Sequence, residues 1–282
     1  MNWLGYSIVA LITFSGYDLL SRFLGVQSKN PRAYGVVFNF FSALAAFLLL
    51  AVEPLKIPTL SVSLLIITLF GMAAWSLFGR FEYYAHKHVE ASTLTIIIRL
   101  ATVINFILSI TFLGESLTII KIIGLMLTLI ASVLVVGIPT VSDIKKSKGL
   151  SYAFLITLLL GIAWTFDKVL APVYGVVLIS FMNFFIPSVA NYASPPLSWS
   201  SIKTEFHIGS WKMIISAVIN VIGYGAMMKA LTLGDASSVI PIATSTSPLV
   251  VLGGVVLLNE NKDKVKKIVA ALLVVLAIYF MR

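Results

Sequence analysis

The chain has 282 residues, of which 59% are hydrophobic and 11% are charged. A soluble domain of this size carries about 25% charged residues, and 20 Lys and Arg with 11 Asp and Glu are too few to cover its surface. The composition predicts an integral membrane protein and excludes most soluble enzymes and DNA-binding domains.

The distribution of charges and the absence of cysteine exclude further classes of function. The net charge of +9 is scattered over short loops and forms no stripe interleaved with aromatic residues, so we expect no nucleic-acid partner. Basic loops in a membrane protein report topology and contact with anionic head groups, which makes the lipid bilayer the expected partner. The sequence contains no cysteine, which excludes disulfides, thiolate catalysis and cysteine-based zinc sites.

Charges, prolines and glycines divide the chain into ten apolar segments of the length that spans a bilayer, about 20 residues. They run from about 3 to 21, 33 to 52, 61 to 84, 91 to 113, 117 to 137, 150 to 170, 173 to 193, 210 to 232, 236 to 258 and 265 to 281. The first lacks the basic start and small-residue cleavage pattern of a signal peptide, so we expect a retained helix. The runs do not alternate with period two, so the prediction is an all-α protein with ten transmembrane helices in the cell membrane.

The sequence contains an internal repeat. Tyr34-Gly35-Val36-Val37 returns as Tyr174-Gly175-Val176-Val177. A constant offset of 145 then pairs Ala85 with Ala230, Glu90 with Asp235, Ala91-Ser92 with Ala236-Ser237, Glu115 with Glu260, and Lys121 with Lys266. The unit has five helices, and an odd number of spans makes the second copy enter the bilayer from the opposite face. We predict two inverted five-helix repeats at 1–137 and 149–282, joined by a linker at 138–148.

The end of each repeat resembles a known family. Ser247-Pro248-Leu249-Val250, Gly254 and Leu258-Asn259-Glu260 match a proline-containing helix followed by a short acidic turn. In the first copy Gly114-Glu115 fits the turn, whereas Val103 replaces the proline and Arg99 stands where the second copy has Thr244. The chain thus resembles the EamA-type permeases of the drug/metabolite transporter superfamily. The resemblance implies ten helices around a central cavity and alternating access for small organic solutes, commonly outward export.

The orientation of the termini is left open. Most Lys and Arg residues lie in loops on the side away from the termini, so the positive-inside rule places both termini outside the cell. The family resemblance implies that both termini are cytoplasmic.

Arg99 is the clearest charge at membrane depth. It follows three isoleucines and lies eight residues, about 12 Å, from the nearer end of its segment. Burying a charge there costs a few kcal/mol or more, so it must face a cavity or a partner. One hypothesis is that Arg99 binds the carboxylate or phosphate of an anionic substrate, or alternates between it and Asp18 as a gate. The alternative is a static pair with Asp18 or Glu82 that locks helices together.

Asp167 is expected near the opposite membrane face, with Lys168 beside it and Lys229 on the same side. These residues suggest a second gate, and the alternative is a pair of interfacial residues facing head groups. Asp18, Glu82 and Asp167 are also the candidates for proton coupling, since burial favours the neutral carboxyl. No sodium site can be recognised.

The ninth segment contains two prolines, Pro241 and Pro248, with four hydroxyl residues, 244–247, between them. Proline removes a backbone donor, and the freed carbonyls must be satisfied by hydroxyls, water or solute inside a bilayer. A helix broken at the midplane is typical of transporter sites. The alternative is an inert kinked helix whose hydroxyls bond their own backbone.

The candidate substrate-binding residues are Tyr17, Asn39, Trp75, Thr95, Arg99, Trp164, Asn183, Tyr224, Thr244 and Ser247. Tyr17, Trp75, Trp164 and Tyr224 either line a solute pocket or serve as ordinary packing. His86, His88 and His207 lack further close ligands, and we expect neither a metal nor a cofactor.

The favoured function is a permease for small polar or amphipathic metabolites, with amino acids and organic acids first because of Arg99. Efflux of cationic or aromatic drugs is the alternative, and a membrane subunit without transport is the rival from another class. No HExxH, GxSxG or paired-aspartate pattern indicates an intramembrane enzyme. The protein is expected to be a monomer or a homodimer.

Overall fold

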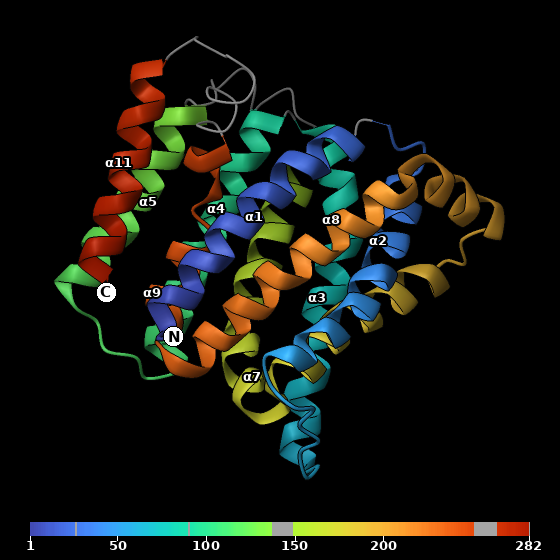
Figure 1. The fold of residues 1–282 in the computed structure, drawn as a ribbon, viewed down its shortest axis with the longest axis horizontal. Helices are drawn as coiled ribbons and strands as arrows, with labels where there is room; N and C mark the ends of the chain where they lie inside the picture. Colours follow the sequence, from blue (N-terminus) through green and yellow to red (C-terminus); the bar gives the residue numbers. More distant parts are fainter. Residues whose placement is uncertain (26, 90, 137–148, 251–263, 282) are drawn as a thin grey trace.

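The computed structural model describes all residues except 26, 90, 137–148, 251–263 and 282. Every regular element in this part of the chain is a helix (Figure 1). The prediction of an all-α protein is therefore confirmed for the described residues.

The elements follow one another with short connections. They are α1 (Trp3–Gly25), α2 (Pro31–Ala45), the 3₁₀ helix η1 (Ala46–Ala51), α3 (Val62–His88), α4 (Ala91–Phe112), α5 (Ile119–Val136), α7 (Leu150–Ala193), α8 (Trp199–Leu233), α9 (Ala236–Ala243) and α11 (Lys264–Met281). Each predicted apolar segment overlaps at least one of these helices. The second segment covers α2 and η1, and the ninth begins with α9 and continues into residues outside the described part of the chain.

Four helices are long and apolar enough to cross a membrane among the described residues: Pro31–Ala51, Val62–Glu82, Leu150–Ala193 and Trp199–Leu233. Shorter apolar helices cover Ile97–Phe112, Ile119–Leu134 and Ile268–Met281. Large apolar side chains such as Leu69, Phe70, Leu272 and Val275 are more than half exposed on these helices. So much exposed apolar surface would be unstable in water and is typical of a lipid-facing belt.

The helix α7 is two arms that fold back on each other at Gly175. This glycine has φ +72° and ψ 166°, a conformation that side-chain-bearing residues rarely adopt. Asn183 hydrogen-bonds to Asp167, 16 residues earlier, which a straight helix would place about 24 Å away. The fold-back matches the boundary predicted between the sixth and seventh segments.

The helix α8 also has two parts, and here the sequence-based prediction was wrong. We expected residues 194–209 to form a connection, but Trp199 to Gly209 is helical and a non-helical Ser210, with φ 48°, joins it to the longer apolar part. The helix starts after the two prolines because Ser198 caps it, its hydroxyl accepting the N–H of Ser201 at 3.3 Å. Its residue Glu205 is completely buried.

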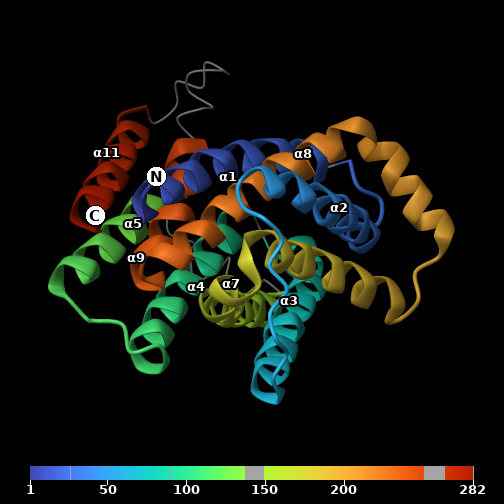
Figure 2. The ribbon, with the colours of Figure 1, turned by 60° about the horizontal axis from the view of Figure 1, so that its bottom comes forward.

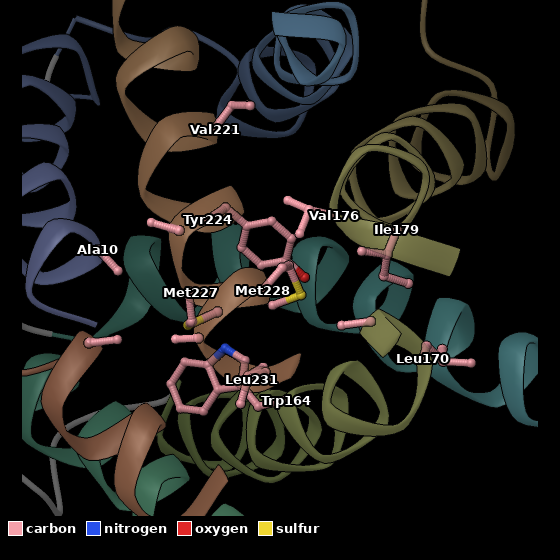
Figure 3. Packing of buried hydrophobic residues seen from close by; sticks show 14 of the residues in the cluster. Ala10, Trp164, Leu170, Val176, Ile179, Val221, Tyr224, Met227, Met228 and Leu231 are labelled. Carbon is pink, nitrogen blue, oxygen red and sulfur yellow. The ribbon is translucent and has the colours of Figure 1, made fainter. Parts of the chain in front are cut away.

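Helices from the two ends of the chain interleave. The helix α1 packs along α8, α3 and α4 pack on α7, and α5 pairs with α11 (Figures 1 and 2). Both termini lie at the same end of the bundle (Figure 1). A large buried cluster at the centre joins α7 and α8 and includes Trp164, Val176, Tyr224, Met227 and Leu231 (Figure 3).

The broken ninth helix is confirmed. Helix α9 ends at Ala243, Thr244 and Ser245 are not helical, and the chain is helical again from 246 to 250. The rest of the predicted segment, 251–258, lies outside the described residues. The break falls between the two prolines, as expected from their missing donors.

Candidate functional site

Arg99 from α4 reaches into the break of the ninth helix. One terminal nitrogen, Nη1, donates a hydrogen bond to the carbonyl oxygen of Thr244. The other, Nη2, donates to the hydroxyls of Thr246 at 2.8 Å and Ser247 at 2.9 Å. In a continuous helix the Thr244 carbonyl would accept from residue 248, but Pro248 has no N–H. The guanidinium therefore satisfies the acceptor that this proline leaves open.

Thr246 connects Arg99 with Asp18. Its hydroxyl donates to Oδ2 of Asp18 at 2.6 Å while accepting from Arg99. The predicted association of these two charges is thus found as a chain of hydrogen bonds through a residue that the sequence analysis did not select. The link joins α1 and α4 to the ninth helix.

A small cavity adjoins Arg99. Its walls come from α4, α5 and the ninth helix: Arg99, Thr102, Thr128, Leu129, Ser132, Pro241, Thr244 and Ser245. The volume is about 10 Å³, enough for about one water molecule and too small for a metabolite. The hydroxyls of Thr244 and Ser245 donate to the carbonyls of Ile240 and Pro241, so these two side chains bond their own helix, as the inert reading of this segment predicted. Thr102, Thr128 and Ser132 were missed as lining residues because single hydroxyls in a helix carry no distinctive signal.

A second polar cluster surrounds Asp167, which is completely buried. Its Oδ1 accepts from Nε1 of Trp75 at 3.1 Å and from Nδ2 of Asn183 at 2.7 Å. Its Oδ2 accepts from the Tyr224 hydroxyl at 2.7 Å, and Nδ2 of Asn183 also donates to that hydroxyl oxygen. The structure therefore brings together four of the residues selected from the sequence, from α3, both arms of α7, and α8.

Aromatic rings enclose this cluster. Trp75 meets Tyr224 edge to face, with ring centroids 5.9 Å apart, and Tyr224 meets Phe184 in the same way at 5.1 Å. Trp164 is buried in the same hydrophobic core, where it packs among apolar side chains (Figure 3). Tyr17 belongs to a different group, and its ring lies 5.5 Å from that of Phe38.

The second gate expected around Asp167, Lys168 and Lys229 stays a prediction, and the structure gives these three residues different partners. The fold-back of α7 brings Asn183 against Asp167, and Trp75 of α3 contacts the same carboxylate. Lys229 forms its ion pair with Glu53 instead. Lys168 donates to the carbonyls of Leu231 and Gly234, at 2.8 and 2.7 Å, at the end of α8.

Glu53 also binds the start of the second arm of α7. Its Oε1 accepts the N–H of Val176 at 2.6 Å, next to Gly175. Burial raises the pKa of Glu53, but the hydrogen bonds from Lys229 and Val176 and the charges of Lys229 and Lys56 together hold it below its ordinary value. Sequence analysis missed Glu53 because it lies in a loop and its partners are more than 100 residues away.

Other carboxylates cap helix starts. Both oxygens of Glu115 accept backbone N–H groups of α9, from Ala236 at 2.7 Å and Ser237 at 2.9 Å. Beside it Lys121 pairs with Asp235 at 2.6 Å. Negative charge at a helix start interacts favourably with its unpaired N–H groups, so the acidic turn predicted after α4 has a structural role.

The remaining predicted residues take part in none of the contacts given above. Asn39 and Glu82 are half-buried, on α2 and α3. The side chain of Thr95 lies outside the described part of the chain. No group of three metal-ligating side chains occurs among the described residues.

Comparison with known proteins identifies the family of the chain and a solved structure with a similar fold. The sequence pattern of the EamA-like transporter family matches residues 1–137 and 147–282. No curated protein matches the chain. The chain is similar to a solved structure that is described simply as the crystal structure of a protein, with 14% sequence identity and a TM-score of 0.72. The match covers 99% of this chain and 95% of the solved chain. At that identity the likeness concerns the fold alone. The family pattern covers nearly the whole sequence, and the chain belongs to the EamA-like transporter family, a family of membrane transporters in the drug/metabolite transporter superfamily.

Proposed function

We propose that the protein is a permease of ten transmembrane helices, built from two inverted five-helix repeats at 1–137 and 149–282 and acting by alternating access in the cell membrane. The two matched segments of the family pattern support this division. So does the position of both termini at one end of the bundle, which an even number of spans requires (Figure 1).

The proposed substrate is a small metabolite with an anionic group, such as an amino acid or an organic acid. The observation that carries this proposal is the position of the Arg99 guanidinium. It donates to the Thr244 carbonyl, which Pro248 leaves without a backbone donor, and it borders a cavity. A planar guanidinium binds a carboxylate through two parallel hydrogen bonds. A carboxylate that enters the cavity takes the place of the Thr246 and Ser247 hydroxyls as acceptor.

Alternating access requires the cavity to enlarge. In the present conformation it holds about one water, so a solute enters only when the ninth helix moves away from α4 and α5. The Arg99–Thr246–Asp18 chain and the Lys229–Glu53 pair lie in different parts of the bundle and are the proposed gates. Glu82 remains a predicted gating residue of α3.

Efflux of cationic or aromatic drugs is the second candidate, because a buried carboxylate lies among aromatic rings. Asp167 with Trp75 and Tyr224 has the composition that attracts an organic cation. Its three hydrogen-bond donors, however, already occupy the carboxylate. The Arg99 site is favoured because its groups border an open volume.

Thermal unfolding of the purified protein across a panel of amino acids, dicarboxylic acids and quaternary ammonium drugs tests the proposal, since a bound ligand raises the Tm. A rise with carboxylate-containing solutes that is lost in Arg99→Gln and kept in Lys203→Gln, a change at an exposed cation that lies over Trp199, supports it. A rise with cations alone, equal in wild type and Arg99→Gln, rejects it in favour of drug efflux.

A further inference from the structure

The groups that contact Asp167 determine which ligand the carboxylate can bind. All three groups that contact the carboxylate do so through hydrogen atoms: the Trp75 and Asn183 N–H groups and the Tyr224 O–H. Each donor is neutral, and no Lys, Arg or His nitrogen lies within 4 Å of Asp167 among the described residues. An ionised carboxylate in this position is a buried charge that hydrogen bonds alone stabilise.

We propose that Asp167 is the proton-binding site of the transporter, and that its protonation is coupled to movement of α3, α7 and α8. The coupling rests on the proposed transport function, whereas proton binding itself does not. A proton fits where other cations do not. Sodium requires several oxygen lone pairs facing the ion, and here the neighbouring groups direct hydrogens toward the carboxylate. An organic cation requires space, and Asp167 is completely buried.

Among the described residues, few charged or titratable groups lie near Asp167. Tyr224 is the titratable group that faces it from α8, while α3 and the second arm of α7 present Trp75 and Asn183, which do not titrate in water. The neighbouring cation Lys168 is directed away, toward the Leu231 and Gly234 carbonyls. The charge of this cluster therefore changes through one carboxyl group.

Protonation weakens the contacts. When a proton bonds to one oxygen of Asp167, the charge of the group falls from minus one to zero, and the carboxyl becomes a donor with less remaining acceptor capacity. The three hydrogen bonds then lose the charge that strengthens them, and the new O–H needs an acceptor of its own. The Oδ1 atom of Asn183 is buried without a hydrogen-bond partner in the described structure, and it provides an acceptor for the additional hydrogen once the amide rotates.

The contacts that change are those that join different parts of the bundle. Trp75 to Asp167 links α3 to the first arm of α7, Asn183 to Asp167 links the two arms of α7, and Tyr224 to Asp167 links α7 to α8. Weakening them on proton binding loosens packing between helices on both sides of the predicted linker. Proton binding therefore directly weakens contacts between helices that must move during alternating access.

Infrared difference spectroscopy of the reconstituted protein, titrated with pH, tests the proposal without a substrate. The wild type is expected to show a carbonyl band of a protonated carboxyl that appears on acidification and is lost in Asp167→Asn. Asp235→Asn, which removes an exposed carboxylate at the start of α9, is the matched control and keeps the band. A band that persists in Asp167→Asn, or no titrating band in wild type, overturns the proposal.

Tyr224→Phe keeps the ring and removes one donor, so it provides a second test if Asp167→Asn does not fold. Loss of a hydrogen bond at the carboxyl is expected to move the band to higher frequency, and an unmoved band contradicts the assignment. The solute-induced Tm shift, measured on the same samples, separates the two proposals. A missing band with an intact shift rejects proton binding alone, and a present band without any shift rejects the solute site alone.

Discussion

The carboxylates of Glu53 and Glu205 each accept a backbone N–H from the other half of the chain. Glu53 accepts the N–H of Val176 at 2.6 Å, and Glu205 accepts the N–H of Asn30 at 2.7 Å. Glu53 follows α2 and η1 and binds the start of the second arm of α7, whereas Glu205 follows that arm and binds the residue that caps α2. Each half of the chain therefore holds the start of a helix in the other half.

Acidification is expected to weaken the Glu53 contact. The pKa of Glu53 is lowered in the folded protein, so its ionised form stabilises the fold fully above the ordinary carboxyl value of 4.5, and this contribution is lost as the pH falls below that value. Thermal unfolding of wild type and Glu53→Gln between pH 3 and 7 checks this. The Tm difference between them is expected to be largest near pH 7 and to shrink toward pH 3. A difference that is constant over this range contradicts the role of the charge.

Replacing Gly175 with alanine is expected to destabilise the protein by more than backbone strain alone. The positive φ costs about 1–3 kcal/mol for a residue with a side chain. A Cβ atom at this position would also lie 2.8 Å from Oε1 of Glu53. Gly114→Ala is the matched control, because Gly114 has φ +69° and nothing within 4 Å of the added atom. Equal losses of the free energy of unfolding in the two variants would show that the close approach to Glu53 has no role.

The outcome at Asp167 shows what the sequence can and cannot predict. The apolar segments and the prolines of the ninth helix predict local structure largely correctly, because they depend on neighbouring residues. The partners of Asp167 come from α3, the second arm of α7 and α8, and depend on how the arms fold back at Gly175. The expected place of Asp167 beside Lys168 and Lys229 named none of these partners, since no local pattern indicates which helices cross.

Dependence on the tertiary structure also explains why the environment of Glu205 and the contacts of Arg99 were not predicted. The prolines at 195 and 196 indicated a loop, although Ser198 directly after them is a helix-capping residue and was the available signal for a helix. The depth of Arg99 and the break in the ninth helix were both predicted separately. Their contact through the Thr244 carbonyl required the tertiary structure.

Glu115 is expected to stabilise the protein more than the neighbouring exposed ion pair does. Its two oxygens satisfy two N–H groups at the start of α9, and removing such a cap costs about 1 kcal/mol or more. Asp235 is about half exposed in its pair with Lys121, and such pairs contribute about 0–1 kcal/mol. Chemical denaturation of Glu115→Ala and Asp235→Asn measures both. A larger loss in Asp235→Asn would contradict the capping role.

Pro248→Ala restores a backbone donor opposite the Thr244 carbonyl. The new N–H is expected to compete with Arg99 for this acceptor and to make the ninth helix more continuous. The Tm of the free protein should be equal or higher, while the Tm shift caused by a carboxylate solute should fall several-fold. Pro187→Ala, at a buried proline inside α7, is the control for a general effect of removing proline. An unchanged solute shift in Pro248→Ala would contradict a site built on this break.

Uptake into proteoliposomes is the most direct test of carboxylate transport through Arg99. Radiolabelled amino acids, dicarboxylic acids and quaternary ammonium drugs are supplied to vesicles that contain wild type, Arg99→Lys or Arg99→Gln. We expect at least one carboxylate solute to accumulate in wild-type vesicles. Arg99→Lys should keep part of this uptake because its charge remains, and Arg99→Gln should reduce it by about tenfold or more. Accumulation of cations alone, equal in wild type and Arg99→Gln, would contradict it.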